Sequence, residues 1–295
     1  MKKITFLLAI VLIFIITANG QNDTLYVMKG GSVINKQSIK LSDLDSIKFI
    51  VSDTMAFVKN NVIVNKQSIK TSDVDSIVFY KPTLGSSTTV KDYDGNVYNT
   101  VNIGTQVWMA ENLKTTHYAN GTVIPFVNSN AAWDALTSTS EAYCWHSDDI
   151  NNKNSYGALY TWSAAMNSEL SSTNNPSGIQ GVCPTGWHLP SDAEWTQLTD
   201  FLGGETVAVG KLKSTTGWYN GGNGTNESGF TALPAGVRHS SGGIFNYIGI
   251  NSRWWSATEE SSIIALDRLL GYNLTELERY GNYKEAGNSV RCVRD

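Results

Sequence analysis

Two stretches of the chain, residues 23–49 and 53–79, are copies of one another, shifted by thirty positions. Both carry the core NKQSIK, followed by SD, DSI and a phenylalanine. Each copy is predicted to form a strand, a tight turn and two further strands, because the pairs Gly30–Gly31 and Asn60–Asn61 tolerate positive φ. A unit of about thirty residues cannot bury a core alone, so we expect the two copies to pack on each other.

The repeats form the first of two expected parts. Their predicted strands and capped helical turns are, in order, Leu25–Met28, Val33–Ile34, a turn capped by Ser42, Ile47–Phe49, Met55–Val58, Val62–Val64, a turn capped by Ser72, and Ile77–Tyr80. Residues 21–80 are therefore interpreted as a small β-rich spacer or docking module, since no chemistry in them supports a ligand-binding repeat. Residues 81–89, rich in Pro, Gly, Ser and Thr, are the predicted linker, and residues 90–295 the large domain.

The first twenty residues are predicted to be a cleaved signal peptide. Lys2 and Lys3 precede an apolar run from Ile4 to Ile16, and Ala18-Asn19-Gly20 places small residues where a signal peptidase acts. The alternative is a membrane anchor, but the run is short for a span of about 20 residues. We therefore expect an exported protein that is extracellular, on the cell surface or periplasmic, with no transmembrane segment in the mature chain.

Charge excludes some partners. The chain has 22 basic and 26 acidic side chains, and two of the basic ones lie in the predicted signal peptide. An acidic mature chain argues against nucleic acid and against strong attraction to anionic lipid. Only 16% of the residues are charged, which suits an extracellular, turn-rich protein better than a cytosolic enzyme.

The large domain is predicted to open with a β-meander over residues 90–93, 97–103 and 106–109. Asp92 and Asp94, two residues apart, invite a calcium-loop interpretation, but no later Glu falls at the required spacing. An Asp-Gly hairpin turn is the favoured interpretation.

Two helices are predicted further along. One covers residues 156–168, with Leu159, Trp162 and Met166 on one face. The clearer one starts at Ser191, whose side chain caps it while Glu194 returns a hydrogen bond, and it ends at Gly203-Gly204. The remaining strands are short, and no βαβ rhythm is visible, so the sheet is expected to be mixed or antiparallel.

Seven segments follow one another along the large domain: DYDGNVYNTVNIGTQVWMAENLK, YGALYTWSAA, CPTGWHLPSDAEWTQL, GKLKSTTGW, NESGFTALPAGVR, WWSATE and SVRCVRD. Together they closely resemble the Fibrobacter succinogenes major paralogous domain family. The resemblance covers residues 90–295 and not the repeats. More remotely, WHLPSDAEW and SVRCV are similar to parts of the formylglycine-generating enzyme domain, which is related to the C-type lectin fold.

The remote resemblance implies a compact α+β domain with long loops, whose N- and C-terminal strands pair. It also implies a disulfide between Cys183 and Cys292, which leaves Cys144 as a free thiol. Formylglycine-generating enzymes use a copper-binding cysteine pair, and no spare pair remains here. Their oxidase chemistry is therefore not carried over.

The sequence offers no strong catalytic or metal-binding pattern, and we expect neither a metal nor a cofactor. The four histidines are far apart in sequence, and His188 is interpreted as a packed side chain. There is no Gly-x-Ser-x-Gly turn. Glu259 and Glu260 are adjacent, so on a strand they face opposite sides and cannot flank one bond. The chain is therefore expected not to be an enzyme.

Aromatic side chains beside Asn, Arg and Gly suggest a binding surface, because a ring covers the C–H face of a sugar while amides bond its hydroxyls. The predicted ligand-binding residues are Arg253, Trp254, Trp255, Asn251, Arg238 and Tyr247; the alternative is that the two tryptophans belong to the core. The leading hypothesis is a secreted or cell-surface, non-enzymatic binding module whose partner is a glycan or a surface protein. The alternatives are a structural or docking component of a surface assembly, and an enzyme on a formylglycine-generating-enzyme-like scaffold.

Overall fold

A computed structural model describes residues 23–29, 32–39, 46–49, 54–59, 62–68, 76–80 and 89–294. The chain divides into two compact units, Met1–Pro82 and Thr83–Asp295. The predicted signal peptide, the predicted linker up to residue 88 and the helical turns at Ser42 and Ser72 lie outside the described residues.

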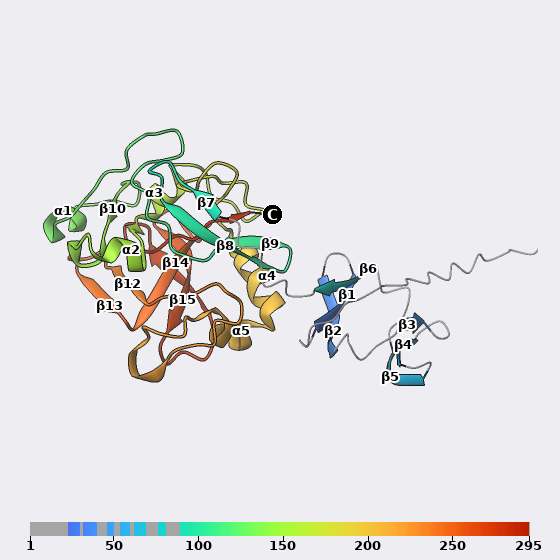
Figure 1. Ribbon diagram of the computed structural model, residues 1–295. Helices are drawn as coiled ribbons and strands as arrows, with labels where there is room; N and C mark the ends of the chain where they lie inside the picture. The colour runs from blue at the N-terminus through green and yellow to red at the C-terminus, as the bar shows by residue number, and fades with distance from the viewer. Residues whose placement is uncertain are drawn as a thin grey trace, which may run out of the picture. The chain divides into compact units, whose positions relative to one another are not determined.

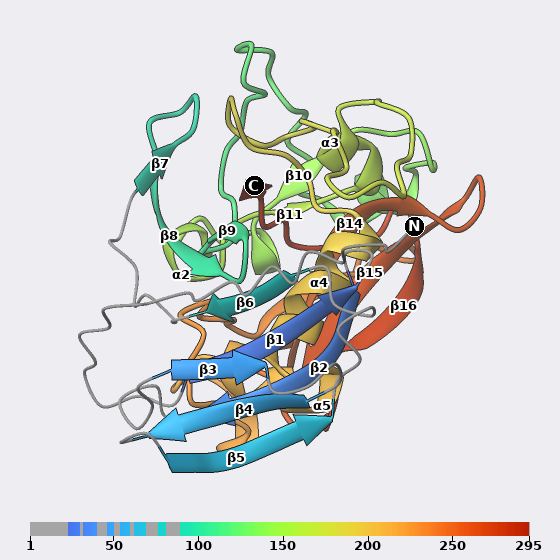
Figure 2. The same ribbon diagram turned by 90° about the vertical axis from the view of Figure 1, so that its right-hand side faces the viewer.

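Six strands of the repeats are described: β1 (Asp23–Lys29), β2 (Ser32–Ile39), β3 (Ser46–Phe49), β4 (Thr54–Lys59), β5 (Val62–Ser68) and β6 (Ser76–Tyr80) (Figure 2). They form two antiparallel sheets in the orders β2-β1-β6 and β3-β4-β5. Each sheet thus joins the hairpin of one copy to the last strand of the other. The two copies interact as predicted, and both second strands are longer than expected.

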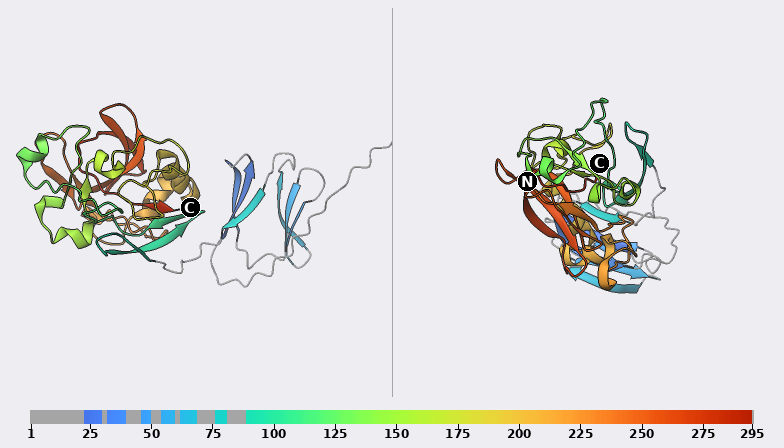
Figure 3. Two further views of the ribbon diagram at one scale, coloured as in Figure 1. Left: turned by 90° about the horizontal axis from the view of Figure 1, so that it is seen from above. Right: turned by 90° about the vertical axis from the view of Figure 1, so that its left-hand side faces the viewer.

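The large unit opens with the predicted meander, formed by β7 (Thr89–Lys91), β8 (Val97–Ile103) and β9 (Gln106–Met109). The last strand, β17 (Val293–Arg294), pairs with β9 in the order β17-β9-β8-β7. Figures 1 and 3 show the C-terminus beside these strands. The start and end of the domain therefore meet, as the resemblance implied.

The turn between β7 and β8 is the predicted Asp-Gly turn. Gly95 has φ +83°, and the Asp92 carboxylate accepts hydrogen bonds from the Asn96 backbone and from the Tyr98 hydroxyl. Asp94 accepts from the Thr116 N–H and hydroxyl, and from His117. Both carboxylates are thus bound by protein donors rather than held open for calcium.

Asp94 makes a pH-dependent contribution to the stability of the domain. Burial raises its pKa, but the Thr116 hydrogen bonds and His117 outweigh burial, so the pKa lies below the ordinary 3.8. A lowered pKa contributes stability above pH 3.8 that is lost as the pH falls through the folded-state pKa. We expect Asp94→Asn to be less stable than wild type above about pH 5, with the gap closing toward about pH 2. Urea unfolding across this range measures the gap, and a gap that does not change with pH contradicts the assignment.

The predicted helix over residues 156–168 is wrong in its first half. The chain forms α2 (Asn152–Tyr156), then β11 (Leu159–Tyr160), and only then α3 (Trp162–Met166). Gly157 has φ +77°, and a Cβ there would lie 2.7 Å from both the Asn112 Cβ and the Leu113 carbonyl oxygen. This close approach ends α2 and redirects the chain, and the Thr161 side chain then caps α3.

The predicted helix after Ser191 is confirmed as α4 (Asp192–Leu202). Its capping box is complete, and Gly203 ends it in left-handed geometry. The further helices of the unit are α1 (Asn130–Asp134), η3 (His146–Asp148), α5 (Glu205–Leu212) and η4 (Tyr219–Gly221), and a short strand, β10 (Tyr143–Cys144), pairs with β11. None of the helices in the described residues has the length and apolar character that a membrane span needs.

A mixed five-stranded sheet carries the candidate site. Its order is β13 (Phe245–Ile248), β12 (Ala235–Arg238), β14 (Asn251–Glu259), β15 (Ile264–Gly271) and β16 (Glu278–Tyr283) (Figures 1 and 2). Only the β12–β14 pair is parallel. Since neighbours on a strand alternate between faces, Trp254 and Arg268 lie on the face next to α4, and Arg253 and Asp267 lie on the other.

The C-terminal tail is tied to the segment that precedes α4. Cys183 and Cys292 form a disulfide, which confirms the implied pairing, and His188 and Val293 exchange two backbone hydrogen bonds. Cys144 is a buried free thiol, as expected. The mixed α+β character of the domain is confirmed as well.

Candidate functional site

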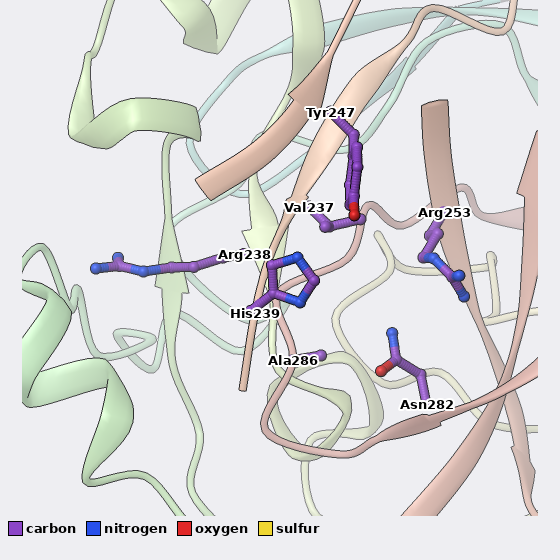
Figure 4. Close-up of a pocket in the computed structure, with 7 residues that line it drawn as sticks. All are labelled: Val237, Arg238, His239, Tyr247, Arg253, Asn282 and Ala286. Carbon is purple, nitrogen blue, oxygen red and sulfur yellow. The ribbon is translucent and has the colours of Figure 1, made fainter. Parts of the chain in front are cut away.

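A pocket of about 150 Å³ opens on the sheet face opposite α4. Its lining comes from the edge and the middle of the sheet and from the segment before the tail, and consists of Val237, Arg238, His239, Tyr247, Arg253, Asn282 and Ala286 (Figure 4). In this view the Tyr247 hydroxyl, the His239 ring and the Asn282 amide point toward a common space. Strands β12, β13, β14 and β16 thus bring residues distant in sequence to one place.

A buried carboxylate organises one side of the pocket. Asp267, on β15, is 0% exposed and accepts hydrogen bonds from Arg253 Nη1 at 2.9 and 3.0 Å. The side-chain amides of Asn282 and Asn288 donate to its Oδ2 at 3.1 and 2.9 Å. Burial raises the pKa of Asp267, although Arg253 and the two amides act in the opposite direction. The carboxylate therefore serves to hold Arg253 and Asn282 in position.

Arg253 and Tyr247, two of the residues predicted to bind a ligand, line the pocket. The Arg253 guanidinium carbon lies 4.9 Å from the centre of the Tyr280 ring, which supports it on the outside of the sheet. Tyr247 is 45% exposed and has φ +67°, an uncommon conformation for a residue of its size. Its ring meets the His239 ring edge to face at 5.8 Å.

Arg238 lines the pocket only with the near part of its chain. Its guanidinium points away (Figure 4) and donates to the Gly243 and Val127 carbonyls and to Asp148. It also lies between the rings of Trp133 and Phe245, at 4.5 and 4.3 Å. Arg238, predicted to bind a ligand, therefore lines the pocket with the near part of its chain, while its guanidinium has a structural role.

The prediction that Trp254 and Trp255 offer ring faces to a ligand is wrong, because both are 0% exposed. Trp254 packs against Trp195 of α4 at 6.2 Å and donates to the Asn112 side chain. Trp255, on the opposite face, donates to the Tyr160 carbonyl. Asn251 does not line the pocket. Both faces of β14 are covered at the tryptophans, so the alternative that they belong to the core holds.

Sequence reasoning missed His239, Asn282 and Asp267. The only local signal is the pair Asp267-Arg268 inside an otherwise apolar strand, ALDRLLG, since charged side chains are rarely buried without partners. His188, interpreted as packed, has a 14% exposed side chain and pairs with the fully buried Glu194 at 2.5 Å. Among the described residues, no group of three or more His, Cys, Asp or Glu side chains is placed to hold a metal ion.

The family model described as the Fibrobacter succinogenes major domain matches residues 101–294. Neither a curated protein nor a solved structure matches the chain. The match spans about two thirds of the sequence and includes every residue of the pocket and of the disulfide. The chain therefore belongs to the Fibrobacter succinogenes major domain family.

Proposed function

We propose that the protein is an exported, non-enzymatic binding module, and that its pocket takes one ring of a glycan. The observation that carries the proposal is the convergence of Arg253, His239, Tyr247 and Asn282 on one small pocket. A few polar groups that converge beside apolar walls are typical of ligand sites. The volume of the pocket is below the roughly 300–1,000 Å³ of sites for drug-sized ligands. A pocket of this size suits a single sugar ring.

Hydrogen-bonding capacity supports a sugar. Within the described residues, neither ring nitrogen of His239, nor the Tyr247 hydroxyl, nor the Asn282 Oδ1 has a protein partner. These groups supply both hydrogen-bond donors and acceptors. A sugar hydroxyl needs both, because it donates one hydrogen bond and accepts others. Val237 and Ala286 add an apolar wall, and the half-exposed Tyr247 ring offers a face for sugar C–H groups.

The scaffold we propose is C-type-lectin-like, related to that of the formylglycine-generating enzymes. The pairing of β17 with β9 and the Cys183–Cys292 disulfide support it. Asp267, the carboxylate beside the pocket, is not placed to act as a general base, because it already accepts hydrogen bonds from Arg253, Asn282 and Asn288. A general base needs a free lone pair directed at the substrate.

A glycan array with the chain from residue 21 to 295 tests the proposal. We expect binding that falls at least about ten-fold in Tyr247→Asn, which removes the ring while asparagine tolerates the positive φ. Tyr283→Asn is the matched control, since Tyr283 is 51% exposed but does not line the pocket. Equal losses in both variants, or a flat array, contradict the proposal. If the array is flat, deletion of residues 21–82 tests the alternative that the protein is a docking component. That alternative predicts that assembly is lost while the large domain stays folded.

A further inference from the structure

We infer that the pocket selects an acidic sugar, a ring that carries a carboxylate, such as a uronate at the end of a chain. This inference rests on the proposed function and names its ligand class. It starts from the hydrogen-bonding edge of Arg253 that Asp267 leaves open.

Arg253 uses one nitrogen, Nη1, for both of its bonds to Asp267. Within the described residues, its Nε and Nη2 have no acceptor. A guanidinium carries five donors in a planar fork, and the Nε–Nη2 edge matches the two oxygens of a carboxylate. Its position is held by Asp267 on one side and by the Tyr280 ring on the other. The fork is therefore positioned before a ligand arrives.

No carboxylate of the pocket lining opposes a negatively charged ligand. No Asp or Glu side chain is among the lining residues, and Asp267 is buried beneath them. The negative charge of Asp267 is met by Arg253, Asn282 and Asn288. A ligand thus meets the cationic edge of Arg253 together with donors from Tyr247 and His239, rather than the carboxylate behind them.

Size favours a charge that the ring itself carries. A pocket of about 150 Å³ suits a single sugar ring better than a ring with a long acidic side chain. We therefore expect the carboxylate that meets Arg253 to be a substituent of the ring. A peptide C-terminus shares the carboxylate but lacks the ring hydroxyls that His239, Tyr247 and Asn282 are able to bond.

The experiment compares four kinds of probe on the chain from residue 21 to 295: the methyl glycosides of glucuronate and galacturonate, their methyl esters, the matching neutral glycosides, and a short peptide with a free or an amidated C-terminus. Titrations followed by NMR or calorimetry give each Kd. We expect each acid that binds to do so at least about ten-fold more tightly than its ester, because hydrogen bonds to charged groups are the stronger class. Acid and ester of equal affinity overturn the inference and leave glycan binding standing. Binding of the free but not the amidated peptide overturns both. Binding of none of the probes overturns the inference, and the glycan array then decides the proposed function.

The variant Arg253→Lys separates the effect of the bidentate Nε–Nη2 edge from the effect of the positive charge. Lysine keeps a cation beside Asp267, so the variant is expected to fold, but it lacks the bidentate edge. The acid-to-ester ratio should then fall to about three or less. The control is Arg279→Lys, since Arg279 is 55% exposed and pairs with Asp192 on the α4 side of the sheet. An unchanged ratio in Arg253→Lys contradicts the inferred role.

Discussion

Replacing Cys183 and Cys292 together by alanine lowers the free energy of unfolding of the large domain by about 4–5 kcal/mol. The two cysteines are 109 residues apart, so their bond closes one loop that contains α4, α5 and β12–β16. Without the bond, the unfolded chain regains the entropy of that loop, for which the chain-entropy model gives about 4.7 kcal/mol at a length of about 100 residues. This is a large part of the roughly 5–15 kcal/mol that a domain has.

The tail of the domain has other ties, and so the variant is expected to fold at low temperature. His188 and Val293 still pair, and the Arg291 side chain still donates to the carbonyls of Phe230 and Thr231. Urea unfolding of wild type and variant measures the difference. The control, Cys144→Ala, removes a buried thiol that crosslinks nothing and should cost about 1 kcal/mol.

Thiol counting checks the same assignment without mutation. We expect no reactive thiol in the native protein, one after denaturation and three after denaturation with reductant, because Cys144 is buried and the other two are joined. Burial also raises the pKa of the Cys144 thiol to about 12, which slows its reaction further. A double variant as stable as wild type, or three thiols without reductant, contradicts the assignment.

The elements that sequence reasoning predicted correctly are those determined locally. Helix α4 follows from Ser191, Glu194 and Gly203 within thirteen residues, and the meander from Asp-Gly and Gly-Thr turns. The helix over residues 156–168 failed because Gly157 contacts Asn112, a partner 45 residues away, and nothing near Gly157 records that contact. The disulfide came from the family resemblance rather than from the spacing of the cysteines.

The pocket was predicted only in part for a similar reason. Strand periodicity places Arg253 and Trp254 on opposite faces, but it does not say what covers each face. Here α4 covers Trp254, and only Arg253 reaches the pocket. His239 directly follows β12 and Asn282 lies on β16, and the register of the sheet, which a sequence alone does not specify, brings them beside Arg253.

Asp267→Ala has the second large expected effect, and it joins the stability of the domain to the site. The variant should lose about 3–5 kcal/mol of unfolding free energy, because Arg253 and the amides of Asn282 and Asn288 lose their shared acceptor in the core. Burial disfavours the ionised carboxylate, but a guanidinium left without it costs more. Asp267→Asn keeps the shape and one acceptor oxygen, so its loss should be smaller, about 1–3 kcal/mol.

Ligand affinity distinguishes a positioning role of Asp267 from a role in packing alone. At a temperature where both Asp267 variants are folded, we expect each to bind the array ligand at least about ten-fold more weakly, because Arg253 and Asn282 are no longer held toward the pocket. Glu227→Ala, which removes an exposed carboxylate 3.9 Å from Lys211, should change stability by less than about 1 kcal/mol and leave binding intact. Full affinity in folded Asp267→Ala would show that the pocket does not depend on its buried carboxylate. If the Asp267 variants lose as much affinity as Arg253→Lys, the two residues act together, and Asp267 contributes to binding by positioning Arg253.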